Sequence, residues 1–192
     1  MSNKFNNLVR ITLSSSVLLF TSCKDDVLPK PPSQLRLDYP IANYDTFENH
    51  CPFTFNMNSE AIIKEENDCG FTISYPKMKA TIYLTYKPVN GNIDKLLRDA
   101  QKLTYEHVIK ADEIIEQPYL NPKKKVYGVF YKVSGNAATN AQFYATDSIK
   151  HFLTASVYFY AKPNFDSIMP AADYIRNDMQ NLMETLQWTR DR

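Results

Sequence analysis

Glycine, tryptophan and histidine are scarce in this chain of 192 residues, which contains 4 Gly, 1 Trp and 3 His. The sequence has no glycine-rich phosphate loop, no nucleophile elbow, no HExxH zinc motif and no Cys-x-x-Cys pair. Its histidines, His50, His107 and His151, stand far apart, so only folding can bring two of them together. We therefore expect no catalytic residues, no metal site and no bound cofactor, and we predict that the protein is not an enzyme.

An excess of charge of one sign is also missing. Lys and Arg total 22 against 21 Asp and Glu, which gives a formal net charge of +1. Residues 1–22 carry Lys4 and Arg10 and no acidic residue, so the remainder of the chain has a net charge of −1. Nucleic-acid binding requires a basic patch, and the run of lysines at 123–125 is expected to be a solvated turn. The sequence therefore predicts no nucleic-acid partner.

The first 23 residues have the layout of an export signal. Basic Lys4 and Arg10 are followed by a short apolar run and by small residues directly before Cys23. This order is typical of a secretory leader, and a cysteine at its end is typical of a bacterial lipobox. We predict that residues 1–22 are removed as a signal peptide and that Cys23 is lipidated, with palmitate among its acyl chains. The alternative is an ordinary leader whose cysteine carries no lipid.

Residues 23–34 have the composition of a tether. Residues 24–26 are all charged, and three prolines between positions 29 and 32 stiffen the next stretch. We expect this lipidated, proline-rich segment to hold a single globular domain, residues 35–192, away from the lipid. The predicted location is therefore the cell envelope, with the domain anchored to a membrane and lying in the periplasm. Exposure on the cell surface is the alternative.

Two cysteines, Cys51 and Cys69, remain for the folded part of the chain. Export places them in an oxidising compartment, where an even pair is commonly bridged. They lie 18 positions apart, and closing a loop of that length contributes about 3 kcal/mol in the chain-entropy model. A zinc site is the alternative, but it needs more ligands than the neighbouring His50 supplies. We predict a Cys51–Cys69 disulfide.

The hydrophobic pattern alternates between a period of two and a period of 3.6, which is typical of an α+β fold. Period-two alternation predicts strands over residues 53–55, 71–75, 80–86, 126–133, 142–146 and 151–161. Apolar residues at helical spacing predict one helix over 93–111 and another over 168–186. We predict an antiparallel sheet of about six strands packed with two main helices. Its layout resembles the PsbP/Mog1-like α/β/α sandwich.

Four side chains form the candidate interaction surface. Thr85 and Tyr83 point to the polar side of one predicted strand, and Tyr158 and Tyr160 point to the polar side of another. Aromatic side chains are enriched among the residues that dominate binding energy at protein interfaces. The alternative is that a helix covers this face, which would make these residues part of the core.

A different class of function is also open. Tyr105, His107 and His151 would line a site between the sheet and the helices if the fold brought them together, as expected of a ligand-binding or enzymatic lipoprotein. His107 shares the apolar stripe of the first predicted helix. A lone histidine at such a position is more often a hydrogen-bonded residue at the edge of the core than a catalyst.

Several blocks of the sequence resemble a known family. They begin with Cys23 and residues 25–31 and continue over residues 35–40, 71–76, 81–90, 96–107, 135–138, 142–148 and 158–164. On these blocks the chain resembles the GldD-type gliding-motility lipoproteins of the Bacteroidota, over nearly all of its expected mature length.

The resemblance implies a noncatalytic envelope component required for gliding, a process tied to type IX protein secretion. It implies protein–protein contacts with other gliding and type IX secretion envelope proteins, and a membrane contact through the lipid anchor. The family brings no catalytic residues to transfer, so the lipidated Cys23 is the one position carried over. The resemblance does not establish that the host cell glides, because such components also occur in nonmotile Bacteroidota.

Overall fold

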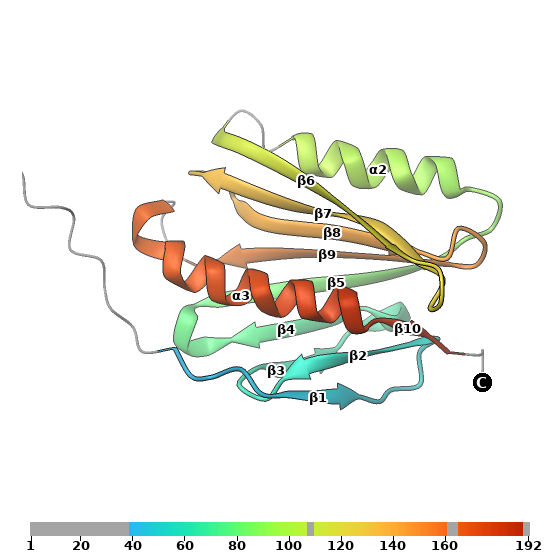
Figure 1. Cartoon of the computed structure of the whole chain (residues 1–192), viewed down its shortest axis with the longest axis horizontal. Coiled ribbons are helices and arrows are strands. Elements are labelled where there is room, and N and C mark those ends of the chain that lie inside the picture. The colour runs from blue at the N-terminus through green and yellow to red at the C-terminus, as the bar shows by residue number, and fades with distance from the viewer. Residues whose placement is uncertain (1–38, 107–109, 161–164, 190–192) are drawn as a thin grey trace, which may run out of the picture. The chain divides into compact units, whose positions relative to one another are not determined.

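The computed structural model describes residues 39–106, 110–160 and 165–189 (Figure 1). The main sheet has seven strands, all antiparallel to their neighbours, in the order β3-β4-β5-β9-β8-β7-β6. In chain order its strands are β3 Ile62–Glu65, β4 Phe71–Tyr75, β5 Ala80–Pro88, β6 Ala111–Asn121, β7 Val126–Gly135, β8 Thr139–Thr146 and β9 His151–Phe159. The described residues also form a smaller sheet and two α-helices, namely β1 Tyr44–Phe47, β2 Phe53–Asn58, β10 Gln187–Trp188, α2 Ile93–Tyr105 and α3 Phe165–Thr185.

Strands β5 and β9 are half-buried in the way that their sequence pattern predicts. Ile82 pairs with Val157 and Leu84 pairs with Ala155, and all four side chains are buried on the same face of the sheet. The intervening side chains point to the other face, because successive residues of a strand alternate sides. The predicted assignment of the two faces is therefore confirmed for these strands.

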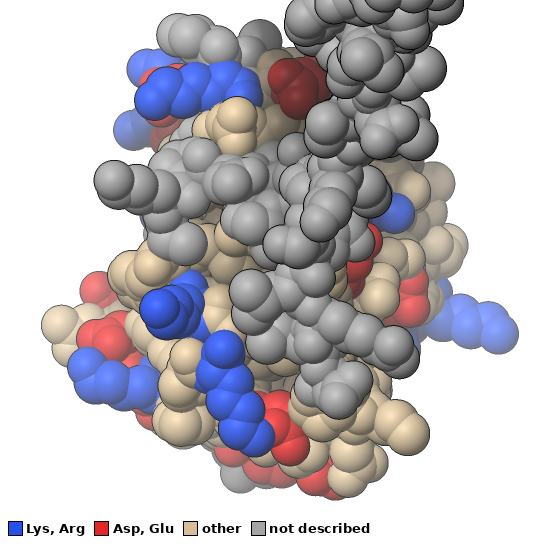
Figure 2. All heavy atoms as spheres, turned by 90° about the vertical axis from the view of Figure 1, so that its left-hand side faces the viewer, with Lys and Arg blue, Asp and Glu red and all other residues tan. Residues whose placement is uncertain are grey.

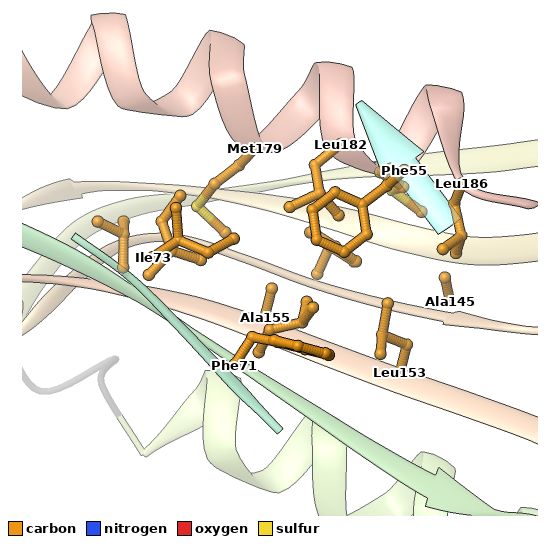
Figure 3. Packing of buried hydrophobic residues seen from close by; sticks show 14 of the residues in the cluster. Phe55, Phe71, Ile73, Ala145, Leu153, Ala155, Met179, Leu182 and Leu186 are labelled. Atoms are coloured by element: carbon orange, nitrogen blue, oxygen red, sulfur yellow. The ribbon is translucent and has the colours of Figure 1, made fainter. Parts of the chain in front are cut away.

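Helix α3 and strand β2 cover this apolar face. Figure 3 shows Met179 and Leu182 of α3, and Leu186 directly after the helix, pointing into the same cluster as Phe55 of β2 and the strand residues beneath them. Each of these four side chains is at most 3% exposed, and burying one of this size stabilises the fold by about 1.5–3 kcal/mol. The helix predicted over residues 168–186 therefore packs on the sheet as its apolar stripe requires.

Helix α2 packs on the opposite face of the sheet. Leu96 and Ala100 lie against Phe152 of β9, and the side-chain amide of Gln142 donates hydrogen bonds to the Thr104 hydroxyl (2.9 Å) and the Ala100 carbonyl (3.3 Å). The sheet thus lies between the two helices, which Figure 3 shows on opposite sides of the strands. The predicted α+β fold is confirmed, while the likeness to PsbP/Mog1-like proteins stays an analogy of layout.

The helix predicted over residues 93–111 is too long. It ends at Tyr105, and Ala111 begins β6, which the sequence pattern did not identify as a strand. Leu103, assigned to the buried stripe, is 39% exposed. Strand β6 is an edge strand with a register shift between Ala111 and Glu113. Such an irregularity breaks the period-two pattern, and the apolar residues near the start of β6 then fall at a spacing close to helical.

The described residues contain no helix with the length and apolarity needed to span a membrane. On the end of the molecule drawn in Figure 2, acidic and basic side chains are interspersed among the coloured residues and do not gather by sign. This distribution agrees with the near-zero net charge of the sequence. The predicted leader (1–22), Cys23, the tether and His107 lie outside the described residues.

Candidate functional site

Helix α2 covers only part of its face of the sheet and leaves an aromatic region open. We call Tyr83, Thr85, Tyr158 and Tyr160 the open face. Tyr83 is 42% exposed and Tyr160 is 63% exposed, while Thr85 is exposed and Tyr158 is partly buried. Tyr83 and Tyr160 are therefore surface residues and not part of the core beneath a helix.

The tyrosines of the open face contact one another. The hydroxyl oxygens of Tyr83 and Tyr160 lie 2.6 Å apart, and the rings of Tyr83 and Tyr158 meet edge to face with centroids 5.7 Å apart. The Tyr160 backbone N–H donates to the carbonyl of Lys79 (2.7 Å), which fixes the chain just after β9. The shared hydrogen bond raises the pKa of Tyr83 and lowers the pKa of Tyr160. The three rings are thus held together before any partner arrives.

Hydroxyl groups and one ion pair surround the open face. Thr72 and Ser74 continue the same side of the sheet on β4. At the β3 end of this side, the Lys64 ammonium lies 3.0 Å from the Glu66 carboxylate, and the Thr72 hydroxyl donates to the same carboxylate (3.4 Å). The open face is therefore an uncharged surface of rings and hydroxyls with charges at its margin. It is suited to contact and hydrogen bonding.

Tyr105 and His151 do not share a site. The Tyr105 hydroxyl at the end of α2 contacts the carboxylate of Glu116. His151 lies on the α3 side of the sheet, where the Tyr86 hydroxyl is 2.9 Å from its Nδ1 and the Trp188 ring stacks on its imidazole at 5.0 Å. The two residues are on opposite faces of the sheet, so the site proposed between them is not formed.

A disulfide joins Cys51 and Cys69, with an S–S distance of 2.08 Å. It links the loop before β2 to the connection between β3 and β4. Two polar side chains lie beside it: His50, the neighbour of Cys51 in the chain, and Glu65, which only the fold brings close. His50 Nε2 is 3.9 Å from Cys51 Sγ and 3.3 Å from a carboxylate oxygen of Glu65, the last residue of β3.

Asp178 of α3 is a buried carboxylate that the sequence reasoning missed. It is 4% exposed and accepts hydrogen bonds from the Tyr44 hydroxyl (2.5 Å) and the Asn58 side-chain amide (2.8 Å), while the Tyr75 hydroxyl interacts with it more weakly. Burial raises its pKa, although these hydrogen bonds act in the opposite direction. A usable signal was present, because Asp178 lies three residues after Ile175 and therefore on the apolar stripe of α3.

A cavity of about 390 Å³ lies near this carboxylate. Its walls come from the first described residues, the β2–β3 turn and the β4–β5 turn, and include Tyr39, Ile62, Tyr75 and Met78. The Lys77 ammonium and the Glu60 carboxylate, which also line it, form an ion pair at 3.1 Å. The cavity is therefore mainly apolar, with one charged pair in its wall.

Comparison with known proteins places this chain in a family. The family described as gliding motility lipoprotein GldD matches residues 24–188. The chain belongs to the GldD family of gliding motility lipoproteins. The match begins directly after Cys23, ends in β10 and includes the whole open face, so the resemblance found in the sequence is confirmed. A search of curated proteins gave no match.

Membership of the GldD family establishes the coarse features of the function. The protein is a lipoprotein, and therefore a membrane-anchored protein of the cell envelope, with a role in gliding motility. This role suggests that it interacts with the motility machinery. In the described part of the chain, the exposed rings and hydroxyls of the open face form a surface for such contacts.

Proposed function

We propose that this protein is a noncatalytic subunit that joins envelope proteins of the gliding machinery and of the associated type IX secretion apparatus. Its lipidated Cys23 anchors it to a membrane, and its domain contacts its partners in the periplasm through the open face. Membership of the GldD family supports the setting. The exposed, mutually packed tyrosines support the mode of action.

The observation that carries the proposal is the packing of the aromatic rings in the open face. Tyrosine supplies a large contact area and a hydroxyl with few rotatable bonds, so it loses little conformational entropy on binding. Tyr83 is already held by Tyr158 and Tyr160, which lowers the cost of ordering it further. A surface with these properties is expected to contribute strongly to affinity for a protein partner.

The tether sets how far the open face can lie from the membrane. Residues 24–34 are proline-rich and charged, and eleven extended residues span at most about 36–40 Å. The domain is therefore expected to reach partners within a few nanometres of the lipid surface. This range suits contact with membrane-embedded subunits and with periplasmic subunits that lie close to them.

Affinity capture from native membranes tests the proposal. The full chain would be captured as wild type, as a Tyr83→Ala/Tyr160→Ala double variant and as Tyr105→Ala, and copurifying proteins would be identified by mass spectrometry. We expect the double variant to recover at least tenfold less of each gliding or secretion subunit than the wild type does. The reason is that truncating a hot-spot residue costs at least about 2 kcal/mol of binding free energy.

Tyr105→Ala is the matched control, because Tyr105 is 48% exposed but lies outside the open face. It should recover the same subunits as the wild type at the same protein level. If the double variant is as abundant as the wild type and captures the same proteins in the same amounts, the open face is not the contact surface. If the wild type captures no gliding or secretion subunit, the proposed role itself is wrong.

The cavity beside Tyr75 supports a second candidate function, binding of a small apolar ligand. Its volume of about 390 Å³ lies within the range of ligand pockets, about 300–1,000 Å³. Filling it by Met78→Trp would prevent such binding without changing the open face. If this variant captures partners normally but fails to support function in cells, a ligand in the cavity is favoured over contacts alone.

A further inference from the structure

Three side chains that can bind a metal converge at the Cys51–Cys69 disulfide, and a fourth lies beside one of them. The nearest ligand atoms of His50, Cys51 and Cys69 all lie within 4.8 Å of one another. The carboxylate of Glu65 adds a fourth, because one of its oxygens is 3.3 Å from His50 Nε2. Two sulfurs, an imidazole nitrogen and a carboxylate oxygen are ligands that zinc accepts in tetrahedral sites.

The fold holds each of these residues independently of a metal. The side chain of Asn49 accepts a hydrogen bond from the Cys51 backbone N–H (2.7 Å) and donates one to the Phe53 carbonyl (3.2 Å), which shapes the loop before β2. Glu65 is fixed by its register with Phe71 in the β3–β4 pair. Cys69 ends the short 3-10 helix η2, Asn67–Cys69, that connects those strands.

We propose that the reduced protein binds one Zn²⁺ ion through His50, Cys51, Glu65 and Cys69. A dithiol reductant transfers two electrons and two protons to the disulfide, which yields two thiols and leaves the reductant oxidised. Zinc binding then displaces both thiol protons and forms two Zn–S bonds. The metal and the disulfide are therefore alternative crosslinks between the same two loops, and each excludes the other.

The distances around His50 already suit a tetrahedral ion. Zn–N and Zn–O bonds of about 2.0–2.1 Å and Zn–S bonds of about 2.3 Å place neighbouring ligand atoms about 3.3–3.8 Å apart. His50 Nε2 lies 3.3 Å from the Glu65 oxygen and 3.9 Å from Cys51 Sγ. Once the disulfide is open, rotation of the cysteine side chains provides the remaining adjustment, since their Cα atoms are 5.7 Å apart.

The cluster is accessible to an ion and to a reductant from one side. The side chains of His50 and Glu65 are 71% and 43% exposed, whereas Cys51 is buried at the edge of the core and Cys69 is partly buried. Zinc bound here would keep the β3–β4 connection attached to the loop before β2 whenever the disulfide is not formed. The expected use is to preserve the native arrangement before oxidation or after reduction.

Titration of the full mature chain with cobalt(II), after reduction and under anaerobic conditions, tests the proposal. We expect one ion per chain, a thiolate-to-cobalt charge-transfer absorption, and displacement of cobalt by zinc. The disulfide form should give no such absorption. His50→Ala and Glu65→Gln should each weaken zinc affinity at least tenfold, because each removes a ligand.

Glu66→Gln is the matched control. Glu66 follows Glu65 in the chain and is exposed, but its carboxylate faces Lys64 and Thr72, so its loss should leave zinc affinity unchanged. Circular dichroism and thermal unfolding of the oxidised variants would show that each is folded. The proposal is overturned if the reduced wild type binds no cobalt at tens of micromolar, or if the folded His50→Ala variant binds zinc as tightly as the wild type does.

Discussion

Replacing Asp178 by leucine tests whether the buried carboxylate holds the small sheet to α3. The substitution keeps the approximate size of the side chain but removes the acceptor for Tyr44 and Asn58 and the carboxylate with which Tyr75 interacts. Tyr44 is partly exposed and can turn its hydroxyl toward water, whereas Asn58 and Tyr75 are 1% and 3% exposed. At least two buried donors would therefore be left without the carboxylate as partner.

Each unsatisfied buried donor costs about 1–3 kcal/mol. Removing the buried charge offsets part of this loss of stability, because burial destabilises the ionised form of Asp178. The net loss of unfolding free energy at neutral pH is therefore expected to be about 2–4 kcal/mol. For a chain of this size this corresponds to a fall in the unfolding midpoint of roughly 6–12 °C.

Urea unfolding of the oxidised protein, followed by tryptophan fluorescence, measures this loss. The chain has 1 Trp, and Trp188 is stacked on His151, so its emission reports loss of the packed fold. Asp173→Leu is the matched control on the same helix, because Asp173 is exposed and pairs with Arg176 of α3 instead of with the small sheet. The reasoning is refuted if Asp178→Leu is no less stable than Asp173→Leu.

The pH dependence of the unfolding free energy tests the role of Asp178 independently. The pKa of Asp178 is raised above 3.8 in the folded protein, so the folded state holds this proton more tightly than the unfolded state does. Stability contributed by Asp178 is therefore present at pH values below 3.8 and decreases as pH rises through the folded-state pKa. Asp178→Asn should remove this decrease, and an unchanged pH profile would contradict the assignment.

Three further predictions concern other parts of the chain. Gly128→Ala should cost about 1–3 kcal/mol or more, since the new Cβ would lie 1.9 Å from the Tyr144 carbonyl oxygen and 2.9 Å from Met183 Cε; an unchanged unfolding free energy would argue against this packing. Reducing the Cys51–Cys69 disulfide in the presence of a chelator should lower the unfolding free energy by about 3 kcal/mol, and a change below about 1 kcal/mol would contradict it. Cys23→Ser should move the protein from the membrane fraction to the soluble fraction, and unchanged membrane association would exclude the lipid as its anchor.

Much of the fold was predictable because one face of its central strands is apolar and the other is mainly polar or hydroxyl-bearing. In β5 and β9 one face packs on α3 and the other does not, so apolar and polar residues alternate in the sequence. The stripe of α3 was equally clear, because its apolar residues lie on one side of the helix and pack into a single core cluster. Strong periodicity follows from this contrast between the two sides of an element, and for β5, β9 and α3 the prediction was correct.

The edge strands were not predictable for the same physical reason. In β6, Ile115 and Leu120 are 44% and 72% exposed, and the irregular pairing after Ala111 interrupts the alternation. In β3, Ile62 is 62% exposed although Ile63 packs against the core. With little burial to separate one face from the other, the order of apolar residues in these segments carries little information about conformation.

Some features of the candidate sites could likewise be predicted from local sequence patterns, and others could not. Tyr83 and Thr85 could be assigned to one face of a strand from local alternation, because that inference needs no long-range contact. The approach of Glu65 to His50 and of Asn58 to Asp178 depends on loops and elements far apart in the chain. Such juxtapositions follow from the tertiary arrangement, which local sequence patterns do not specify.

Site-specific photo-crosslinking in intact cells tests the central claim most directly. A photoreactive residue would replace Tyr83 in the open face, and in a second strain it would replace Leu120, which is 72% exposed on β6 at the far edge of the sheet. We predict that position 83 crosslinks to a gliding or type IX secretion envelope protein and that position 120 does not. Equal crosslinking at both positions, or none at position 83 in cells where the protein is folded and membrane-bound, would contradict the account.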